Sequence, residues 1–243
     1  MTAQAQAKTG RHDAPVLTPQ REEAALTLLR GALEKHGPAI AQASSFSSED
    51  VVVTDLLARI RPDIRVFAID TGRLPEETLL CADAVAARFH LRIEWFFPRH
   101  DAVEKLIRDG GTHSFRESLE NRHACCGIRK VEPLSRALAG LTAWITGLRR
   151  DQNVSRTQLA EAEPDPLHGG MLKYNPLAAW TAGDVLAYAN ARRLPVNRLY
   201  ARGYRSIGCA PCTRAVQAGE DERAGRWWWE APEHKECGLH ARH

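Results

Sequence analysis

Four cysteines in two groups constrain this 243-residue chain more than any other feature. Cys125 and Cys126 are adjacent, and Cys209 and Cys212 form a Cys-x-x-Cys pair. Four thiolates from two segments can bind zinc or an iron–sulfur cluster, and a Cys-x-x-Cys pair alone can also be redox-active. Adjacent side chains diverge, which is awkward for one tetrahedral zinc ion, whereas a 4Fe–4S cluster has separate iron corners. Ligand geometry therefore favours the cluster over zinc, and either over four unrelated buried thiols.

The composition is typical of a globular protein, with 44% hydrophobic residues, 26% charged residues and a formal net charge of +3. No uncharged apolar run is long enough for a membrane span, and the N-terminus lacks the apolar centre of a signal peptide. Six cysteines are too few for a disulfide scaffold and fit a reducing compartment. We therefore expect a cytoplasmic protein without membrane association.

Strands and helices alternate along the middle of the chain. Expected strands span residues 39–43, 65–70, 91–97 and 143–146. Expected helices include a first one that ends at the His36-Gly37-Pro38 stretch, 49–60, a segment beginning at Pro75, 101–108, and one through Cys125 to Leu134. This order predicts an α/β fold with a doubly wound, mostly parallel sheet. Residues 161–170 contain two prolines and two glycines and predict a mobile loop, and Thr181 begins a capping box that opens a helix to about Arg192.

Three segments fall at the carboxyl ends of the expected strands, where such sheets bind ligands. The first is a serine loop, with Ser44, Ser45 and Ser47, before a helix N-terminus. It predicts an anion site, although a simple Ser N-cap explains the spacing equally well. The second segment is Asp70-Thr71-Gly72, and the third contains Gly147, Arg149 and Arg150. The two arginines taken alone favour a solvated surface pair.

The C-terminal region carries a second kind of signal. Cys237 lies in a polar segment with basic neighbours at Lys235 and His240, which favour a reactive thiolate. Trp227, Trp228 and Trp229 are most simply packing residues, and Cys81 lies on an apolar helix face. We expect a disordered N-terminal tail over 1–15, an α/β domain over 16–218, and a mobile C-terminal tail over 219–243.

Several motifs together point to one family. They are Ser-Ser-Phe-Ser-Ser-Glu-Asp, Asp-Thr-Gly-Arg-Leu, Cys-Cys-x-x-Arg-Lys, Gly-Leu-Arg-Arg, Gly-Cys-x-x-Cys-Thr, Gly-Arg-Trp-Trp-Trp and Lys-Glu-Cys-Gly-Leu-His. Over about Ile40 to His240 the chain resembles the assimilatory adenylyl-sulfate reductases, which reduce adenosine 5′-phosphosulfate (APS) to sulfite. The resemblance implies a fold similar to the adenine nucleotide α-hydrolases. It also allows a homo-oligomer.

The resemblance assigns roles to individual residues. A 4Fe–4S cluster would be held by Cys125, Cys126, Cys209 and Cys212. Cys237 would attack the sulfur of APS, releasing AMP and forming an S-sulfocysteine that reduced thioredoxin, or a glutaredoxin-like reductant, then cleaves. His240 and Lys130 would assist, with Lys130 coupling an electrostatic role of the cluster to the substrate. Cations for the substrate would come from Lys130, Arg149, Arg223, Arg226 and His240, and adenosine would lie against Ser44, Ser45, Ser47, Asp70, Thr71, Gly72 and Gly147.

Three alternatives remain from the sequence. A reductase that prefers the 3′-phosphorylated substrate, or accepts both, is the nearest, although such enzymes typically lack both cysteine pairs. A tRNA-modifying enzyme would need an ATP-type glycine-rich loop and a strongly basic surface, so no nucleic-acid partner is expected. A zinc-stabilised interaction module would leave Cys237 and the cations without a role.

Overall fold

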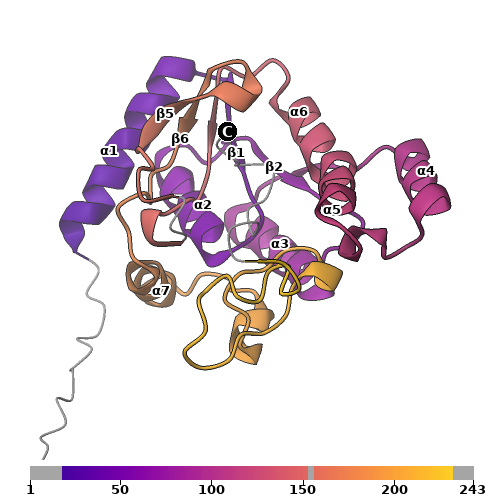
Figure 1. Ribbon diagram of the computed structural model, residues 1–243. Coiled ribbons are helices and arrows are strands. Elements are labelled where there is room, and N and C mark those ends of the chain that lie inside the picture. The colour runs from indigo at the N-terminus through magenta and orange to yellow at the C-terminus, as the bar shows by residue number, and fades with distance from the viewer. Residues whose placement is uncertain (1–17, 153–155, 232–243) are drawn as a thin grey trace, which may run out of the picture.

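The computed structural model describes residues 18–152 and 156–231. Within these residues the chain forms one six-stranded sheet in the order β3-β2-β1-β4-β6-β5, in which only β5 runs antiparallel to its neighbour (Figure 1). The strands are β1 (Ile40–Ala43), β2 (Val66–Ile69), β3 (Glu94–Phe96), β4 (Ala143–Ile145), β5 (Ala162–Asp165) and β6 (Met171–Tyr174). The predicted α/β class and the mostly parallel sheet are confirmed.

Helices cover both faces of the sheet. The helices are α1 (Pro19–His36), α2 (Ser48–Ile60), α3 (Glu76–Phe89), α4 (His100–Gly110), α5 (Leu119–Cys126), α6 (Glu132–Leu138) and α7 (Ala182–Ala191). The larger core joins one face of the sheet to α1, α2, α3 and α7, and Cys81 is buried within it as a packing residue. The other face packs against α6 through Leu134, Ala137 and Leu138. Burial on both faces explains why β2 and β4 are continuously apolar rather than alternating.

Local signals in the sequence account for several element ends. The helix ending before Gly37 and the capping box of Thr181 with Asp184 are confirmed. The third strand is confirmed but is shorter than expected, at Glu94–Phe96. The helix expected through the paired cysteines is interrupted, because a π-helical turn at Gly127–Val131 separates α5 from α6. Single π turns frequently mark functional sites.

The prediction of a mobile loop over residues 161–170 is wrong. Those residues contain β5 and a short turn that lead directly into β6. The prolines misled the prediction, since an edge strand tolerates a residue without an N–H, and Pro164 lies on the outermost strand.

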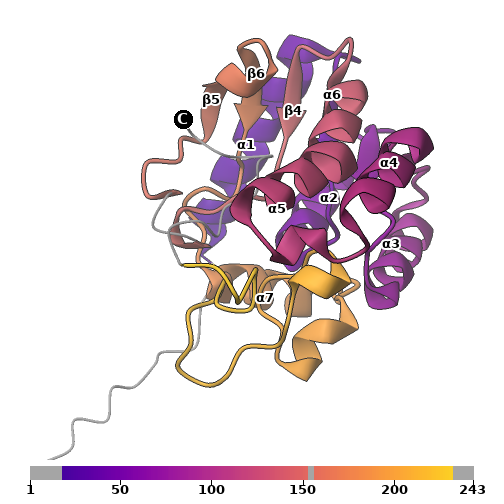
Figure 2. The same ribbon diagram turned by 45° about the vertical axis from the view of Figure 1, so that its right-hand side comes forward.

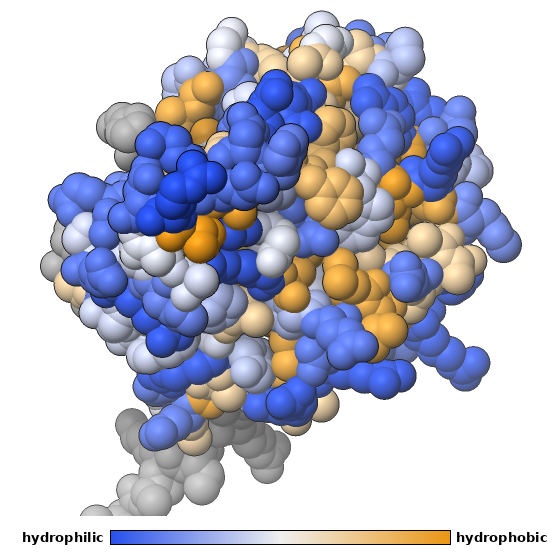
Figure 3. Space-filling model, turned by 90° about the vertical axis from the view of Figure 1, so that its right-hand side faces the viewer, coloured by the Kyte–Doolittle hydropathy of each residue, from blue (hydrophilic) through white to orange (hydrophobic). Residues whose placement is uncertain are grey.

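The segment after α7 folds back beside the carboxyl edge of the sheet, where Figure 2 shows it in orange and yellow. Residues 219–231 belong to this packed region: Arg226 bridges Thr213, and the Trp227 N–H donates to the Cys212 carbonyl at 3.1 Å. Trp227 is fully buried as expected of a packing residue, whereas Trp228 is 38% exposed. Most side chains on the face shown in Figure 3 are hydrophilic, and smaller apolar areas lie between them. None of the helices in the described ranges has the length and apolarity needed to cross a membrane.

Candidate active site

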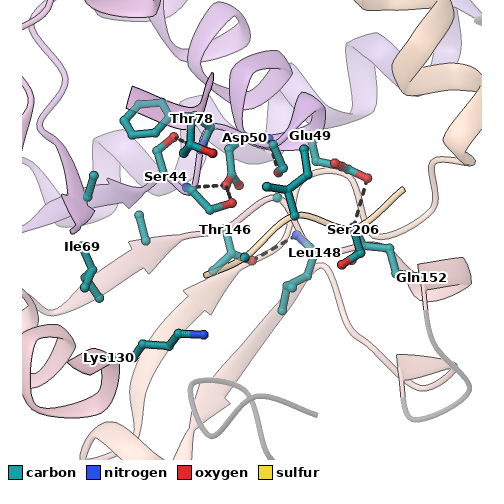
Figure 4. A pocket seen from close by; sticks show the side chains of 18 of the residues that line it. Ser44, Glu49, Asp50, Ile69, Thr78, Lys130, Thr146, Leu148, Gln152 and Ser206 are labelled. Carbon is teal, nitrogen blue, oxygen red and sulfur yellow. Dashed lines mark hydrogen bonds between the residues drawn. The ribbon is translucent and has the colours of Figure 1, made fainter. Parts of the chain in front are cut away.

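A cavity of about 240 Å³ opens at the carboxyl ends of β1, β2 and β4. Its walls come from the serine loop, the ends of these strands, residues 205–209 and residues 222–226. Figure 4 shows its two sides, with Ser44, Glu49 and Asp50 on one side and Lys130 on the other. Of the residues predicted to bind substrate, the cavity brings together Ser44, Ser45, Ser47, Thr71, Gly147, Lys130, Arg223 and Arg226.

The serine loop is held by the first turn of α2. Asp50 Oδ2 accepts hydrogen bonds from the Ser45 N–H and the Ser45 hydroxyl, both at 2.6 Å (Figure 4). The Asp50 N–H donates to Ser47 Oγ at 3.4 Å, so the N-cap interpretation of Ser47 is confirmed. Burial raises the pKa of the Asp50 carboxyl to about 6, against the hydrogen bonds from Ser45 that lower it. Substrate binding by this loop stays a prediction.

Gly147 lets the end of β4 approach the start of α2 closely. A Cβ added at this position would lie 2.5 Å from Asp50 Oδ1 and 2.9 Å from Glu49 Cβ. Both atoms belong to the buried acidic turn that forms one side of the cavity. Glycine is therefore required here by contact rather than by backbone conformation.

We expect Gly147→Ala to destabilise the protein by about 1–3 kcal/mol, because one methyl group overpacks the contact between β4 and α2. The matched control is Gly31→Ala in the middle of α1, where an added Cβ meets no described atom within 4 Å. That change should instead stabilise the protein by about 0.5–1 kcal/mol. Urea unfolding of both variants measures the difference, and equal stabilities would contradict the close contact.

Three predicted substrate residues lie outside the cavity wall. Arg149 is fully buried, with hydrogen bonds from Nε and Nη2 to Glu49 Oε1 at 2.9 and 2.8 Å and a further pair to Asp151, so it is not half of a solvated surface pair. Asp70 accepts a hydrogen bond from the Gly72 N–H at 2.8 Å and shapes the turn after β2. Gly72 has φ +68°, and Arg129 packs against it.

Cations from several segments also line the cavity and make up its basic side. Sequence reasoning found Lys130, Arg223 and Arg226 but missed Arg156 and Arg205, which also line the wall. No motif spacing marks these two, because they reach the cavity from irregular segments after β4 and α7. Together the five side chains make a strongly cationic surface for an anion.

Arg226 is held in place on the basic side by its surroundings. It is 6% exposed, its guanidinium lies 4.6 Å from the centroid of the Trp227 ring, and its Nε has no hydrogen-bond partner among the described residues. Gly208 makes room for it, since a Cβ there would lie 2.4 Å from Arg226 Nη2. A stacked guanidinium with spare donor capacity is well suited to binding an anion in the cavity.

The four cysteines of the two pairs converge in a second, smaller cavity. All four are buried thiols, and they pack with Phe115 and Trp227. The remaining wall is formed by the cations Arg73, Arg122, Arg129 and Lys130. Lys130 and Cys209 line both cavities, so the two share a wall.

The chemistry of this donor set fits a sulfur-ligated metal group. Within residues 18–152 and 156–231, no three His, Cys, Asp or Glu side chains are arranged to hold one metal ion. The thiols surround the smaller cavity instead of meeting at a point. Arg73, Arg129 and Lys130 are placed to offset thiolate charge, while Arg122 forms an ion pair with Glu230. Burial raises the pKa of Cys125, and that of Cys212 to about 12, so these two thiols stay protonated at neutral pH and would have to lose their protons to bind a metal. The predicted nucleophile Cys237 and its neighbour His240 lie outside the described residues.

Comparison with known proteins completes the description of the site. Residues 39–215 match the family model described as "Phosphoadenosine phosphosulfate reductase domain". The chain belongs to the phosphoadenosine phosphosulfate reductase family. The matched residues include the serine loop, Lys130 and all four clustered cysteines.

Relatives within this family carry a more specific name. The chain is 53% identical over 198 residues to "Adenosine 5′-phosphosulfate reductase" of Burkholderia cepacia, covering 82% of this chain and 79% of that protein. It is 49% identical over 224 residues to the protein of the same name from Allochromatium vinosum, covering 92% and 87%. These similarities place the chain among the adenylyl-sulfate reductases, as the motifs indicated.

Solved structures support the fold of a family member. Phosphoadenylyl-sulfate reductase from Candida auris, solved as a phosphate complex, superposes with a TM-score of 0.67 at 24% identity, covering 84% of this chain and all of that one. The NH3-dependent NAD synthetase of Campylobacter jejuni gives a TM-score of 0.53 at 10% identity, covering 77% and 78%. The expected similarity to adenine-nucleotide enzymes of this fold is confirmed.

Proposed function

We propose that this reductase converts APS to sulfite and AMP in sulfate assimilation, supplying sulfur for cysteine biosynthesis. The observation that carries the proposal is the shared wall: a cavity with five cations adjoins the four-cysteine cavity through Lys130 and Cys209. The name shared by the similar proteins, adenosine 5′-phosphosulfate reductase, supports APS as the substrate. The nucleotide would lie along the strand ends, with its phosphosulfate against the basic side.

The proposed reaction uses a cysteine nucleophile. The Cys237 thiolate attacks the sulfur of APS, a Cys237 Sγ–S bond forms, the S–O bond to the phosphate breaks, and AMP leaves. The basic side of the cavity stabilises the charge that develops on the leaving phosphate. Reduced thioredoxin then attacks Cys237 Sγ and expels sulfite, and its second cysteine resolves the mixed disulfide, so the two electrons come from the reductant.

We infer that Cys125, Cys126, Cys209 and Cys212 hold a 4Fe–4S cluster. Buried thiols around one cavity, a tandem pair and adjacent cations support this cofactor over zinc. When bound, the cluster would supply a fixed charge beside the substrate. Lys130 lies between the two cavities and would orient the phosphosulfate.

The chain's organisation follows from the same proposal. We propose that residues 16–218 bind nucleotide and cluster, and that residues 219–243 bring Cys237 to the cavity after Arg223 and Arg226 have engaged the anion. A segment that closes over substrate and then opens would admit a protein reductant. We place the reaction in the cytoplasm, because the five cysteines within the described ranges are thiols rather than disulfides.

The deciding experiment is anaerobic release of sulfite from APS with reduced thioredoxin, run beside the 3′-phosphorylated substrate. Sulfite from APS at a much higher kcat/KM supports the proposal. A preference for the 3′-phosphorylated compound would favour the alternative substrate, and no sulfite from either would contradict both.

Removing Arg223 or Arg226 should weaken APS binding. Each Arg→Ala change deletes a charge-assisted contact worth about 1.5–3 kcal/mol, which is about a 10- to 150-fold rise in Kd. Arg202→Ala is the control, because Arg202 is exposed and pairs with Glu77 away from the cavity wall. Titration calorimetry gives the affinities and iron analysis checks the cofactor. Unchanged affinity for APS in both cavity variants would show that these arginines have structural roles and do not bind the substrate.

A further inference from the structure

The buried guanidinium of Arg149 forms ion pairs with three carboxylates at the edge of the larger cavity. Arg149 Nη2 donates to Glu49 Oε1 at 2.8 Å and lies 3.4 Å from Glu222 Oε1, and Nη1 pairs with Asp151. The Arg149 and Glu49 side chains are 1% and 10% exposed. Three negative charges against one positive charge leave a surplus of negative charge beside a cavity suited to an anion.

Glu222 has the longest contact with Arg149 and, like Glu49, lines the cavity. Its carboxylate has the longest of the three contacts with Arg149 and lines the cavity next to Arg223, whereas neither Arg149 nor Asp151 lines it. Burial raises the pKa of Glu222 to about 7; Arg149 opposes that rise, and Glu49, Asp151 and Asp221 add to it. Glu222 can therefore change charge near neutral pH.

Other charged groups also face the cavity, among them Glu49, which accepts hydrogen bonds from Arg149. The basic side consists of Lys130, Arg156, Arg205, Arg223 and Arg226. On the acidic side, Asp50 is held by Ser45, and its pKa of about 6 leaves it ionised above neutral pH. A new negative charge in the cavity raises the pKa of nearby acids, and the acid already near 7 is the first to bind a proton.

We propose that Glu222 takes up a proton from solvent when the dianionic substrate enters the cavity, so that binding removes a carboxylate charge next to the bound anion. This inference rests on the proposed function, because it takes APS as the anion. The neutral acid then lies beside Arg223 without competing with the substrate for that cation. Glu222 is thus a positioning residue whose charge is linked to occupancy of the cavity.

The test measures protons as well as affinity. In a Cys237→Ser chain, APS can bind without transferring its sulfonate, and APS has no group of its own that titrates near neutral pH. Calorimetry at pH 7.5 in two buffers of different ionisation enthalpy should show net uptake of part of one proton. If binding raises the pKa of Glu222 by about one unit, the affinity should fall about fivefold between pH 6.5 and 8.5.

The variants separate this role from simple packing. Glu222→Gln mimics the protonated acid, so it should bind APS more tightly than the parent at pH 8.5, match it at pH 6.5, and take up no proton. Glu220→Gln is the matched control: Glu220 lies two residues away, pairs with Arg214 and is not in the cavity wall. It should keep the pH dependence of the parent.

Two results would overturn the role of Glu222. One is a parent protein whose affinity for APS does not change with pH, and the other is proton uptake that persists in Glu222→Gln, which would assign it to Asp50. A parent that binds no APS at any pH contradicts the proposed function itself. Binding without proton uptake contradicts only the inference about Glu222.

Discussion

Replacing Cys237 with serine is expected to abolish sulfite formation while iron content, fold and nucleotide binding are retained. Serine keeps the shape of the side chain but is a far poorer nucleophile and leaving group in exchange reactions, so the rate should fall by about 10³-fold or more. The direct measurement is mass spectrometry of wild-type protein given APS without reductant. The peptide containing Cys237 should gain one sulfonate, and reduced thioredoxin should remove it.

The identity of the modified peptide decides this prediction, because the clustered cysteines could also be oxidised. Cys81→Ser is a useful control, since Cys81 is buried in the main core and burial raises the pKa of its thiol to about 11. That variant should keep its activity, apart from a loss of stability. A sulfonate found on another peptide, or turnover by the Cys237→Ser protein, would show that Cys237 is not the nucleophile.

Substituting one clustered cysteine should lead to loss of the whole metal centre. Anaerobically purified wild-type protein should be brown, with about four irons and four sulfides per chain. We expect Cys126→Ala to be nearly colourless and less stable, because metal-binding energy is also folding energy for the segments that supply the ligands. Those segments are the end of α5, which leads into the π turn, and the Cys209–Cys212 turn, whose Cys212 carbonyl accepts a hydrogen bond from the Trp227 N–H.

Cys81→Ala provides the comparison for iron as well as for activity. Cys81 is as buried as the clustered cysteines but lies in a different apolar core, so its loss should leave iron content unchanged. Iron and sulfide analysis and visible absorption measure both variants. A colourless wild-type protein with stoichiometric zinc and full activity would exclude the cluster.

The regular part of the fold could be predicted from the sequence because its signals are local. Apolar runs mark the strands, and Gly37 and Thr181 mark helix ends through backbone chemistry that depends only on near neighbours. The hairpin of β5 and β6 could not be predicted. Its pairing of Pro164 with Leu172 is stabilised by tertiary position at the sheet edge, and composition alone indicated a loop.

The site was predictable wherever a motif carried its chemistry. The four cysteines were identified by residue type and the structure brings them together, whereas Arg156 and Arg205 enter the cavity from irregular segments that no periodicity describes. Arg149 was placed at the correct strand end, but a strand end does not determine whether a guanidinium faces ligand or carboxylates. Here Glu49, which is near Arg149 only in the folded chain, determines it together with Asp151.

The two edges of the sheet also limit how copies of this chain can associate. One edge is β3, which has three residues, and the other is β5, which has four and includes Pro164. Short edge strands, one of them interrupted by a residue that cannot donate a hydrogen bond, are poor templates for adding a strand from a neighbouring molecule. Such edges keep partly folded molecules, or folded molecules at high concentration, from assembling into continuous intermolecular sheets. We therefore expect any self-association to use helical and loop surfaces and to be reversible.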